Sequence, residues 1–402
     1  CTIINCLIEG FPIDEIEGVC TISGERVIDN GKAVTKRFSD LISPENSRFF
    51  CWDKPFIQLE TSRGCFNKCA FCISGIDDGV QYLQPEIIEK RINDAVIKGV
   101  KEIRILDRTF NANIVHACSL IEIFKKFEGI VRFHIEFHPA FIGERLKAIL
   151  VDLNPKLLHI ETGVQSLNDE TTKLCRRAGS NTDVVEGIDF LANICNFEVH
   201  ADIIYGLPKY SYKNTLSDIV SLIELGVAEV QIESLKLLPG TKFRLEYDIY
   251  GIIYSSEPPY EILKSDSAEF NELIKLSGVS IAVDLWYNSN SKWRVVFKKL
   301  IQSYREELLD EISEYILFKN NNIQSLNKES RATLFCNFIR SRYGNEASTL
   351  PLYWVADGLS LKKGEGKNLK RWKRDNPSLS NPFYREDKRS LEYYYLDLGE
   401  RT

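Results

Sequence analysis

The hydrophobic pattern between about residues 56 and 236 alternates between two periods. Short apolar, β-branched runs predict strands, and segments with helical spacing of apolar residues follow them. The predicted strands are Phe56–Glu60, Glu102–Leu106, Val131–Glu136, Leu157–Glu161, Val199–Tyr205 and Glu229–Ser234. The predicted helices are Pro85–Lys98, Ile114–Phe127, Gly143–Val151, Thr182–Cys195 and Asn214–Leu225. Strand–helix units in series predict an α/β fold with a parallel sheet and right-handed crossovers.

Polar side chains stand at or near the C-terminal end of each predicted strand. They are Glu60, Asp107, Glu136, Glu161, Asp202 and Glu233. In a parallel barrel this rim is where ligands bind. We therefore predict a partial (βα)6 TIM-like barrel over residues 51–245, with its site at the rim. An open doubly wound sheet is the alternative, although the glycine fingerprint of a dinucleotide fold does not follow the first strand.

The segments on either side of the predicted barrel have other patterns. Residues 1–50 contain two short β-branched runs that lead into Asp29-Asn30-Gly31, a tight-turn signal, and predict a small β-ribbon. After Pro239-Gly240 the pattern becomes mainly helical, so residues 246–402 are predicted to form a helical, substrate-capping domain. Its predicted helices are Ala268–Leu276, Trp293–Phe318 and Lys328–Arg342.

Composition narrows the class of protein. With 402 residues, of which 44% are hydrophobic and 27% charged, the chain is long enough for about two folded domains. A net charge of −6 argues against a nucleic-acid coat protein or a polybasic membrane binder. No apolar run reaches the roughly 18 residues of a membrane span, and the first residues lack the basic start of a signal peptide. The eleven cysteines are an odd number in a long chain, so we expect reduced thiols and a cytoplasmic protein.

Three cysteines directly after the first predicted strand are the main chemical signal. Cys65, Cys69 and Cys72 have CxxxCxxC spacing and can wrap one inorganic cluster on a tight loop. Three thiolates hold three of the four irons of a [4Fe–4S] cluster and leave one iron open, and an open position is typical of a catalytic metal. The alternative is zinc, which requires a fourth ligand, and the five histidines are all distant in sequence.

The cysteine spacing, with Phe71 before the third cysteine, resembles the radical S-adenosylmethionine (radical SAM) superfamily over Phe56–Leu245. The resemblance implies a [4Fe–4S] cluster on the three cysteines and S-adenosylmethionine on the open iron. It also implies a 5′-deoxyadenosyl radical that abstracts a substrate hydrogen atom, and an electron donor such as flavodoxin or ferredoxin.

Later segments resemble the branch that contains coproporphyrinogen dehydrogenases and methylthiotransferases. They are Glu161–Leu167, Ala201–Pro208 and Leu238–Thr241. An arginine after the first of them suits the cofactor carboxylate. The resemblance implies cofactor contacts from Glu161, Gln165, Ser166, Arg176 or Arg177, Asp202, Tyr205 and Leu238. Where the family has a glycine-rich turn for the cofactor amine, this chain has Asp107-Arg108-Thr109-Phe110-Asn111, so we expect Asp107, Thr109 or Asn111 to replace it.

Ile8–Val19 and Tyr250–Tyr260 resemble the segments that flank the barrel in a subgroup with an N-terminal cobalamin-binding domain. That domain itself is absent or truncated in the sequence, so we do not predict cobalamin.

Several residues have two interpretations. Cys336 is either a buried thiol or, as in peptide epimerases of this superfamily, a catalytic hydrogen-atom donor. Glu136 and His138 either move protons or form a structural ion pair. The basic segment around Trp372 is either solvated or binds an acidic peptide or RNA.

The sequence therefore predicts a radical SAM enzyme acting on a peptide or small-molecule substrate, with Cα epimerisation as one form of the reaction. Methyl or methylthio transfer is an alternative, and a non-enzymatic iron–sulfur or zinc sensor or scaffold is another. No membrane and no nucleic-acid partner is expected.

Overall fold

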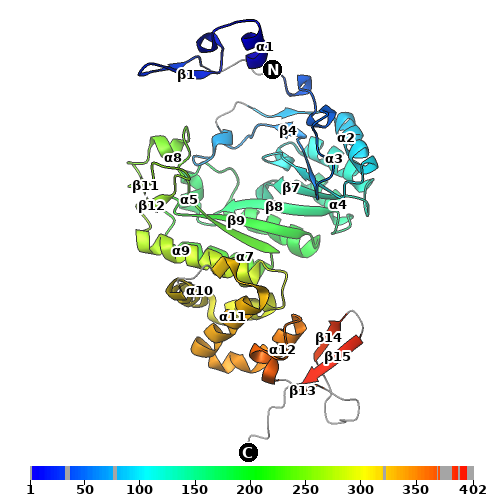
Figure 1. The fold of residues 1–402 in the computed structure, drawn as a ribbon, viewed down its shortest axis with the longest axis vertical. Helices are drawn as coiled ribbons and strands as arrows, with labels where there is room; N and C mark the ends of the chain where they lie inside the picture. Colours follow the sequence, from blue (N-terminus) through cyan, green and yellow to red (C-terminus); the bar gives the residue numbers. More distant parts are fainter. Residues whose placement is uncertain are drawn as a thin grey trace, which may run out of the picture.

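Six parallel strands form the central sheet of the computed structural model, which describes residues 2–31, 37–75, 79–319, 323–368, 370–371, 383–387 and 390–395. The strand order is β10-β9-β8-β7-β6-β3, so each strand pairs with the next one along the chain. A doubly wound sheet reverses its order at a switch point, and this sheet does not. The prediction of an α/β partial TIM-like barrel is therefore confirmed (Figure 1). The strands are β3 (Ile57–Leu59), β6 (Glu102–Ile105), β7 (Arg132–Phe137), β8 (Leu158–Gln165), β9 (Glu198–Tyr205) and β10 (Glu229–Ser234).

Helices cover the outer face of this sheet, where the strand residues are buried and apolar. In β7 that face carries Phe133, Ile135 and Phe137, and in β9 it carries Val199 and Ile203. The covering helices are α2 (Pro85–Ile97), α3 (Ile114–Lys125), α4 (Glu144–Val151), α6 (Asn181–Asp189) and α7 (Tyr212–Leu225). The predicted helix 182–195 ends differently, because α6 runs into a π-helical turn over Phe190–Ile194. A short helix α5 (Asp169–Leu174), which the pattern did not predict, precedes α6.

The inner face of the sheet is mostly polar, with Gly163 and Ile204 as exceptions. Alternate residues of β7, β8, β9 and β10 point to this face and are mostly half-buried or exposed. They include Arg132, His134, Glu136, His159, Glu161, Gln165, Glu198, His200, Asp202, Glu229 and Glu233. Interiors of complete TIM barrels are filled by branched apolar side chains. A polar interior in this sheet instead provides ligand-binding chemistry from one end of the strands to the other.

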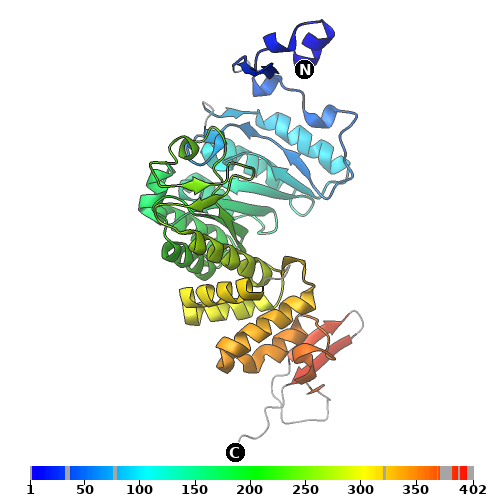
Figure 2. The same ribbon diagram turned by 60° about the vertical axis from the view of Figure 1, so that its left-hand side comes forward.

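Beyond β10 the chain turns through β11 (Ile253–Tyr254) and β12 (Ile262–Lys264), which pair antiparallel. Helix α9 (Phe270–Ala282) then packs against β10 and against α10 (Trp293–Lys319). Figure 2 shows α11 (Lys328–Arg342) and α12 (Leu350–Ala356) further from the barrel, next to a small antiparallel sheet. That sheet consists of β13 (Lys370–Arg371), β14 (Phe383–Asp387) and β15 (Ser390–Tyr395). Trp372, Lys373 and Arg374 of the basic segment lie outside the described residues.

At the other end of the molecule, α1 (Thr2–Ile8) precedes a two-stranded ribbon (Figure 1). Its strands β1 (Cys20–Ser23) and β2 (Arg26–Asp29) pair antiparallel, and the turn between them is Gly24-Glu25. At Asp29-Asn30-Gly31, after the ribbon, the Asp29 carboxylate accepts a hydrogen bond from the amide of Gly31 at 2.9 Å, and Gly31 has a positive φ of 71°. Asn30 donates its side-chain amide to the carbonyls of Asp14 and Ile16, which ties the end of the ribbon to the preceding loop. In the described part of the chain, no helix is long and apolar enough to cross a bilayer.

Candidate functional site

The loop with the three cysteines leaves the C-terminal end of β3. At its base β4 (Ser62–Arg63) pairs antiparallel with β5 (Gln81–Tyr82), so the loop is closed like a hairpin. Gly64 begins the loop with φ of +103°, and a Cβ at this position would overlap the carbonyl oxygen of Gly79. Only glycine adopts this conformation without strain or collision.

The three cysteine side chains converge on one cavity at the C-terminal end of the sheet. Cys65 and Cys69 are buried and Cys72 is half-buried. Burial raises the pKa of the Cys69 thiol, the Arg177 guanidinium lowers it, and Cys72 and Cys65 raise it further. The mutual influence of the three thiols shows that they share one electrostatic environment. Arg177 Nη1 lies 4.0 Å from Cys69 Sγ.

The spread of the thiols fits a cluster better than a single ion. In the described part of the chain, the Sγ atoms of the three cysteines do not form a group in which all ligand atoms lie within 4.8 Å of one another. Thiolates around one zinc ion lie roughly 3.8 Å apart, as tetrahedral 2.3 Å bonds require. Three soft ligands with wider separation suit an iron–sulfur cluster.

Five of the predicted cofactor residues line the same cavity as the cysteines. They are Thr109, Glu161, Gln165, Arg177 and Asp202. Three buried polar atoms of residues that line the cavity have no hydrogen-bond partner in the structure: Gln165 Oε1, Arg177 Nε and Asp202 Oδ1. Unpartnered buried polar atoms cost free energy unless a ligand satisfies them. The wall therefore fits a ligand with amino, carboxylate and hydroxyl groups, such as S-adenosylmethionine.

Carboxyl groups on the inner face of the sheet have different protonation behaviour. Burial, with repulsion from Glu161, raises the pKa of Glu136 to about 7. Burial also raises the pKa of Asp202 well above its usual value, and Glu161 and Glu136 add to the effect. The pKa of Glu161 is lowered, mainly because His134 Nε2 lies 2.9 Å from its carboxylate. The cavity thus combines Glu161, whose pKa is lowered, Asp202, whose pKa is raised, and Glu136, whose pKa of about 7 lies near neutrality.

Three residues with the expected chemistry are used for structure instead. Asp107 is buried and accepts four hydrogen bonds, from the amides and hydroxyls of Thr61 and Ser62. Asn111 is buried and fixes the main chain at His138 and Phe141. The Ser166 hydroxyl contacts Asp218 at 3.3 Å. Asp107, Asn111 and Ser166 do not line the cavity, and their polar atoms are used within the chain; of the three alternatives expected for the cofactor amine, Thr109 lines the cavity.

The structure also separates the two candidate arginines. Cys175 ends α5, and Arg176 adopts a left-handed φ of 54° and is exposed. This turn directs Arg177 into the cavity, where its Nη2 donates to the carbonyl of Gly163. Arg176 is therefore not a cavity residue.

Three further predicted residues lie outside the cavity. Tyr205 is buried and its hydroxyl bonds Ser234, and the Leu238 carbonyl accepts from Thr241. Cys336 is buried in α11, which contacts the neighbouring C-terminal helices. The structure does not bring the Cys336 thiol to the cysteine cavity, so it supports the buried-thiol interpretation.

Other cavity residues were not assigned to the cofactor from sequence. They are Asn67, Phe71, Ser74, Arg108, Glu136, Phe137, His138 and Gly163. Arg108 lies in the same turn as Thr109. The sequence predicted that this turn contacts the cofactor but did not assign Arg108 to that role. Asn67 accepts a hydrogen bond from the amide of Ala178 at 3.3 Å and so ties the cysteine loop to the turn after α5.

Comparison with known families places this site in a defined class of cofactor-binding barrel. Residues 59–222 match the family model of the radical SAM superfamily, and residues 248–376 match a protein family of unknown function, DUF4080. Residues 59–222 are therefore a radical SAM domain, a class that uses a [4Fe–4S] cluster and S-adenosylmethionine. The match to this superfamily covers residues 59–222, and the rest of the chain lies outside it.

Curated relatives match over the barrel. A tRNA-2-methylthio-N(6)-dimethylallyladenosine synthase of Herpetosiphon aurantiacus is 23% identical over 202 residues, 48% of this chain and 46% of that protein. The ribosomal protein uS12 methylthiotransferase RimO of Protochlamydia amoebophila is 23% identical over 205 residues, 48% of this chain and 43% of that protein. The chain thus spans less than half of the length of these relatives.

Two solved structures share the fold. The radical S-adenosylmethionine methyltransferase TsrM of Kitasatospora setae matches with a TM-score of 0.53 and 13% identity, over 66% of this chain and 56% of that one. The cobalamin-dependent radical enzyme OxsB matches with a TM-score of 0.53 and 14% identity, over 88% of this chain and 66% of that one. At this identity the likeness concerns the fold alone.

Proposed function

We propose that the protein uses S-adenosylmethionine and a [4Fe–4S] cluster to remove a hydrogen atom from a peptide or a small amino-acid-like substrate. The observation that carries the proposal is the joint placement of three thiols and three unpartnered polar atoms, from Gln165, Arg177 and Asp202, around one cavity. When bound, the cluster and S-adenosylmethionine supply a 5′-deoxyadenosyl radical.

In this proposal the cavity residues divide into two groups. Cys65, Cys69 and Cys72 hold the cluster, and Arg177 stands beside Cys69 with a free Nε for an anionic group of the cofactor. A guanidinium fork suits a carboxylate. Gln165 has a left-handed φ of 69°, which fixes its direction at the end of β8.

An adjoining cavity provides room for the substrate. It shares Ser74, Arg108 and Glu136 with the cysteine cavity and extends to Glu60 and Arg63, which form an ion pair. Charges of both signs on one wall suit a substrate with amide groups or with both ammonium and carboxylate groups. Glu136 borders both cavities, and a carboxyl group with pKa about 7 both gives and takes a proton at neutral pH.

The other reactions receive less support from the chain. Methylthio transfer calls for a second iron–sulfur cluster, and the other described cysteines do not line the cysteine cavity. The burial of Cys336 in the helical domain removes the residue that favoured Cα epimerisation. The cytoplasmic location stays a prediction, as does a flavodoxin or ferredoxin as the electron donor.

Anaerobic reconstitution with iron and sulfide tests the proposal. With dithionite and S-adenosylmethionine we expect 5′-deoxyadenosine and methionine, detected by chromatography, and reduced flavodoxin is expected to replace dithionite. Cys72→Ala is expected to abolish the product, whereas Cys51→Ala, an exposed cysteine outside the cavity, retains it. A protein that carries its full iron complement but forms no 5′-deoxyadenosine would contradict the proposal and favour a sensor or scaffold.

A further inference from the structure

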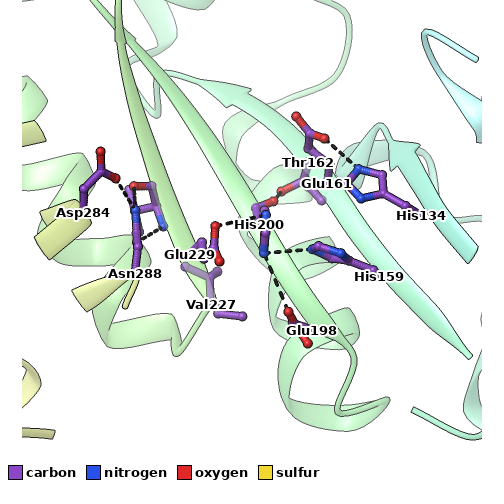
Figure 3. A network of polar contacts seen from close by, with 12 residues as sticks. His134, His159, Glu161, Thr162, Glu198, His200, Val227, Glu229, Asp284 and Asn288 are labelled. Carbon is purple, nitrogen blue, oxygen red and sulfur yellow. Dashed lines mark hydrogen bonds and ion pairs between the residues drawn. The ribbon is translucent and has the colours of Figure 1, made fainter. Parts of the chain in front are cut away.

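Three histidines lie in a row inside the barrel at the N-terminal half of the strands, with neighbouring rings edge to face, and they do not line the cysteine cavity. His134 lies on β7, His159 on β8 and His200 on β9 (Figure 3). The ring centroids of His134 and His159 are 4.5 Å apart, and those of His159 and His200 are 4.1 Å apart.

His159 and His200 face one another next to a carboxylate. The Nε2 atoms of the two histidines are 2.8 Å apart, and His200 Nε2 is 4.0 Å from Glu198 Oε1. One ligand atom from each of the three side chains lies within 4.8 Å of the other two. The parallel register explains this proximity, because it aligns His159 with Glu198 and places His200 two residues further along the same face of β9.

We propose that His159, His200 and Glu198 bind one divalent transition-metal ion of the zinc class. Two imidazoles and a carboxylate are a frequent three-ligand set for zinc, with the fourth position left to water. Tetrahedral bonds of 2.0–2.1 Å place two ligand nitrogens roughly 3.3 Å apart, so the rings need to separate by about half an ångström. The Glu198 side chain is 47% exposed, which gives an ion access from solvent.

Surrounding polar groups orient two of the three ligands, His200 and Glu198. Glu229 Oε2 lies 3.4 Å from His200 Nδ1, so a proton on Nδ1 leaves the Nε2 lone pair directed at the site. Arg132 Nη2 donates to Glu198 Oε2 at 2.8 Å and leaves Oε1 on the side of the histidines. Carboxylate partners of this kind fix the tautomer and direction of metal-binding histidines.

The charge state of the group also suits a cation. Glu198, Glu229 and Glu161 supply negative charge around the pair, and the guanidinium groups of Arg132 and Arg294 lie near two of these carboxylates.

Metal titration in a background without the cysteine ligands tests this site independently of the enzymatic proposal. In Cys65→Ala/Cys69→Ala/Cys72→Ala we expect one Co²⁺ per chain, with visible absorption bands and without the near-ultraviolet band of a thiolate ligand. Zn²⁺ is expected to displace it. Adding His159→Gln and His200→Gln is expected to weaken the affinity by about 100-fold or more. The matched control is His134→Gln, a neighbour in the same row, which retains binding.

Two results would overturn the assignment. One is the absence of stoichiometric Co²⁺ in the triple-cysteine background, and the other is equal affinity after loss of His159 and His200. Circular dichroism and thermal unfolding show whether each variant is folded. If the triple variant does not fold, elemental analysis of the cluster-loaded natural chain replaces it, with one zinc per chain expected and none in His159→Gln/His200→Gln.

Discussion

The guanidinium of Arg177 connects the cysteine loop to strand β8. Its Nη1 lies 4.0 Å from Cys69 Sγ, and its Nη2 donates to the main-chain carbonyl of Gly163. The positive charge lowers the pKa of Cys69 against the effect of burial, which favours the thiolate form that binds iron. The Nε atom is buried without a partner, so one donor is available to a ligand in the cavity.

Replacing Arg177 is therefore expected to weaken cofactor binding. Arg177→Leu removes one charge-assisted hydrogen bond, worth about 1.5–3 kcal/mol, and we expect the dissociation constant for S-adenosylmethionine to rise about 10- to 100-fold. Equilibrium dialysis of the reconstituted protein measures this constant. The control is Arg176→Leu, one residue earlier and exposed, which leaves it unchanged. If Arg177→Leu and Arg176→Leu change the dissociation constant for S-adenosylmethionine equally, Arg177 has no specific role in binding the cofactor.

The two arginines also show what the sequence does and does not determine. The resemblance placed an arginine after β8, and the spacing left Arg176 and Arg177 equivalent. The difference between them depends on the left-handed backbone at Arg176, which follows the end of α5. Because the hydrophobic pattern did not predict α5, the sequence could not distinguish Arg177 from Arg176 as the cavity residue.

The barrel itself was predictable because its signal is local. Apolar β-branched runs alternate with helical spacing, and each strand pairs with its neighbour in sequence. The end of β8 was less predictable. We placed it at Glu161, but the strand continues to Gln165 through Gly163, past a register shift against β9. A glycine and a bulge interrupt the apolar alternation, although the backbone pairing persists.

Contacts between distant residues account for most of the remaining errors. The chemistry of Asp107 and Asn111 suited an amine, but hydrogen bonds to Thr61, Ser62 and His138 use their polar atoms. Likewise, the sequence positions of His159 and His200 gave no reason to pair them. Only the parallel register of β8 and β9 brings them together.

Asp107 is expected to contribute to stability and not to cofactor affinity. Asp107→Ala leaves the buried donors of Thr61 and Ser62 without an acceptor, and unsatisfied donors cost about 1–3 kcal/mol each. We expect the free energy of unfolding to fall by about 3 kcal/mol, measured by urea denaturation. Asp152→Ala, at an exposed position, is the control and is expected to have little effect. A loss of affinity for S-adenosylmethionine without a loss of stability would restore the original assignment of Asp107.

Gly64 is expected to be essential for the cysteine loop. Gly64→Ala introduces a Cβ that overlaps the Gly79 carbonyl, in a backbone conformation that alanine rarely adopts. We expect a clear loss of bound iron after reconstitution, measured per chain by a colorimetric assay. Gly79→Ala is the matched control, because Gly79 also has a positive φ but its added Cβ meets no atom within 4 Å. If the two variants bind equal amounts of iron, backbone strain alone governs the loop and the steric argument is wrong.

Glu136 is expected to make stability depend on pH in a defined direction. Its pKa is raised to about 7 in the folded protein, whereas an unfolded chain has the usual value near 4.5. Below about pH 4.5 both states are protonated and the residue has no effect. Between about pH 4.5 and 7 only the unfolded state releases its proton, so rising pH destabilises the fold, and above pH 7 the difference is constant.

Glu136→Gln removes this penalty and is expected to stabilise the protein by on the order of 2 kcal/mol at pH 8, with a smaller gain at pH 5.5. Urea denaturation of the metal-free protein at the two pH values measures the gain. Glu144→Gln, at an exposed position, is the control and is expected to have little effect on stability. A gain that is the same at both pH values would mean that Glu136 titrates normally, and would remove it as the proton-transfer group between the two cavities.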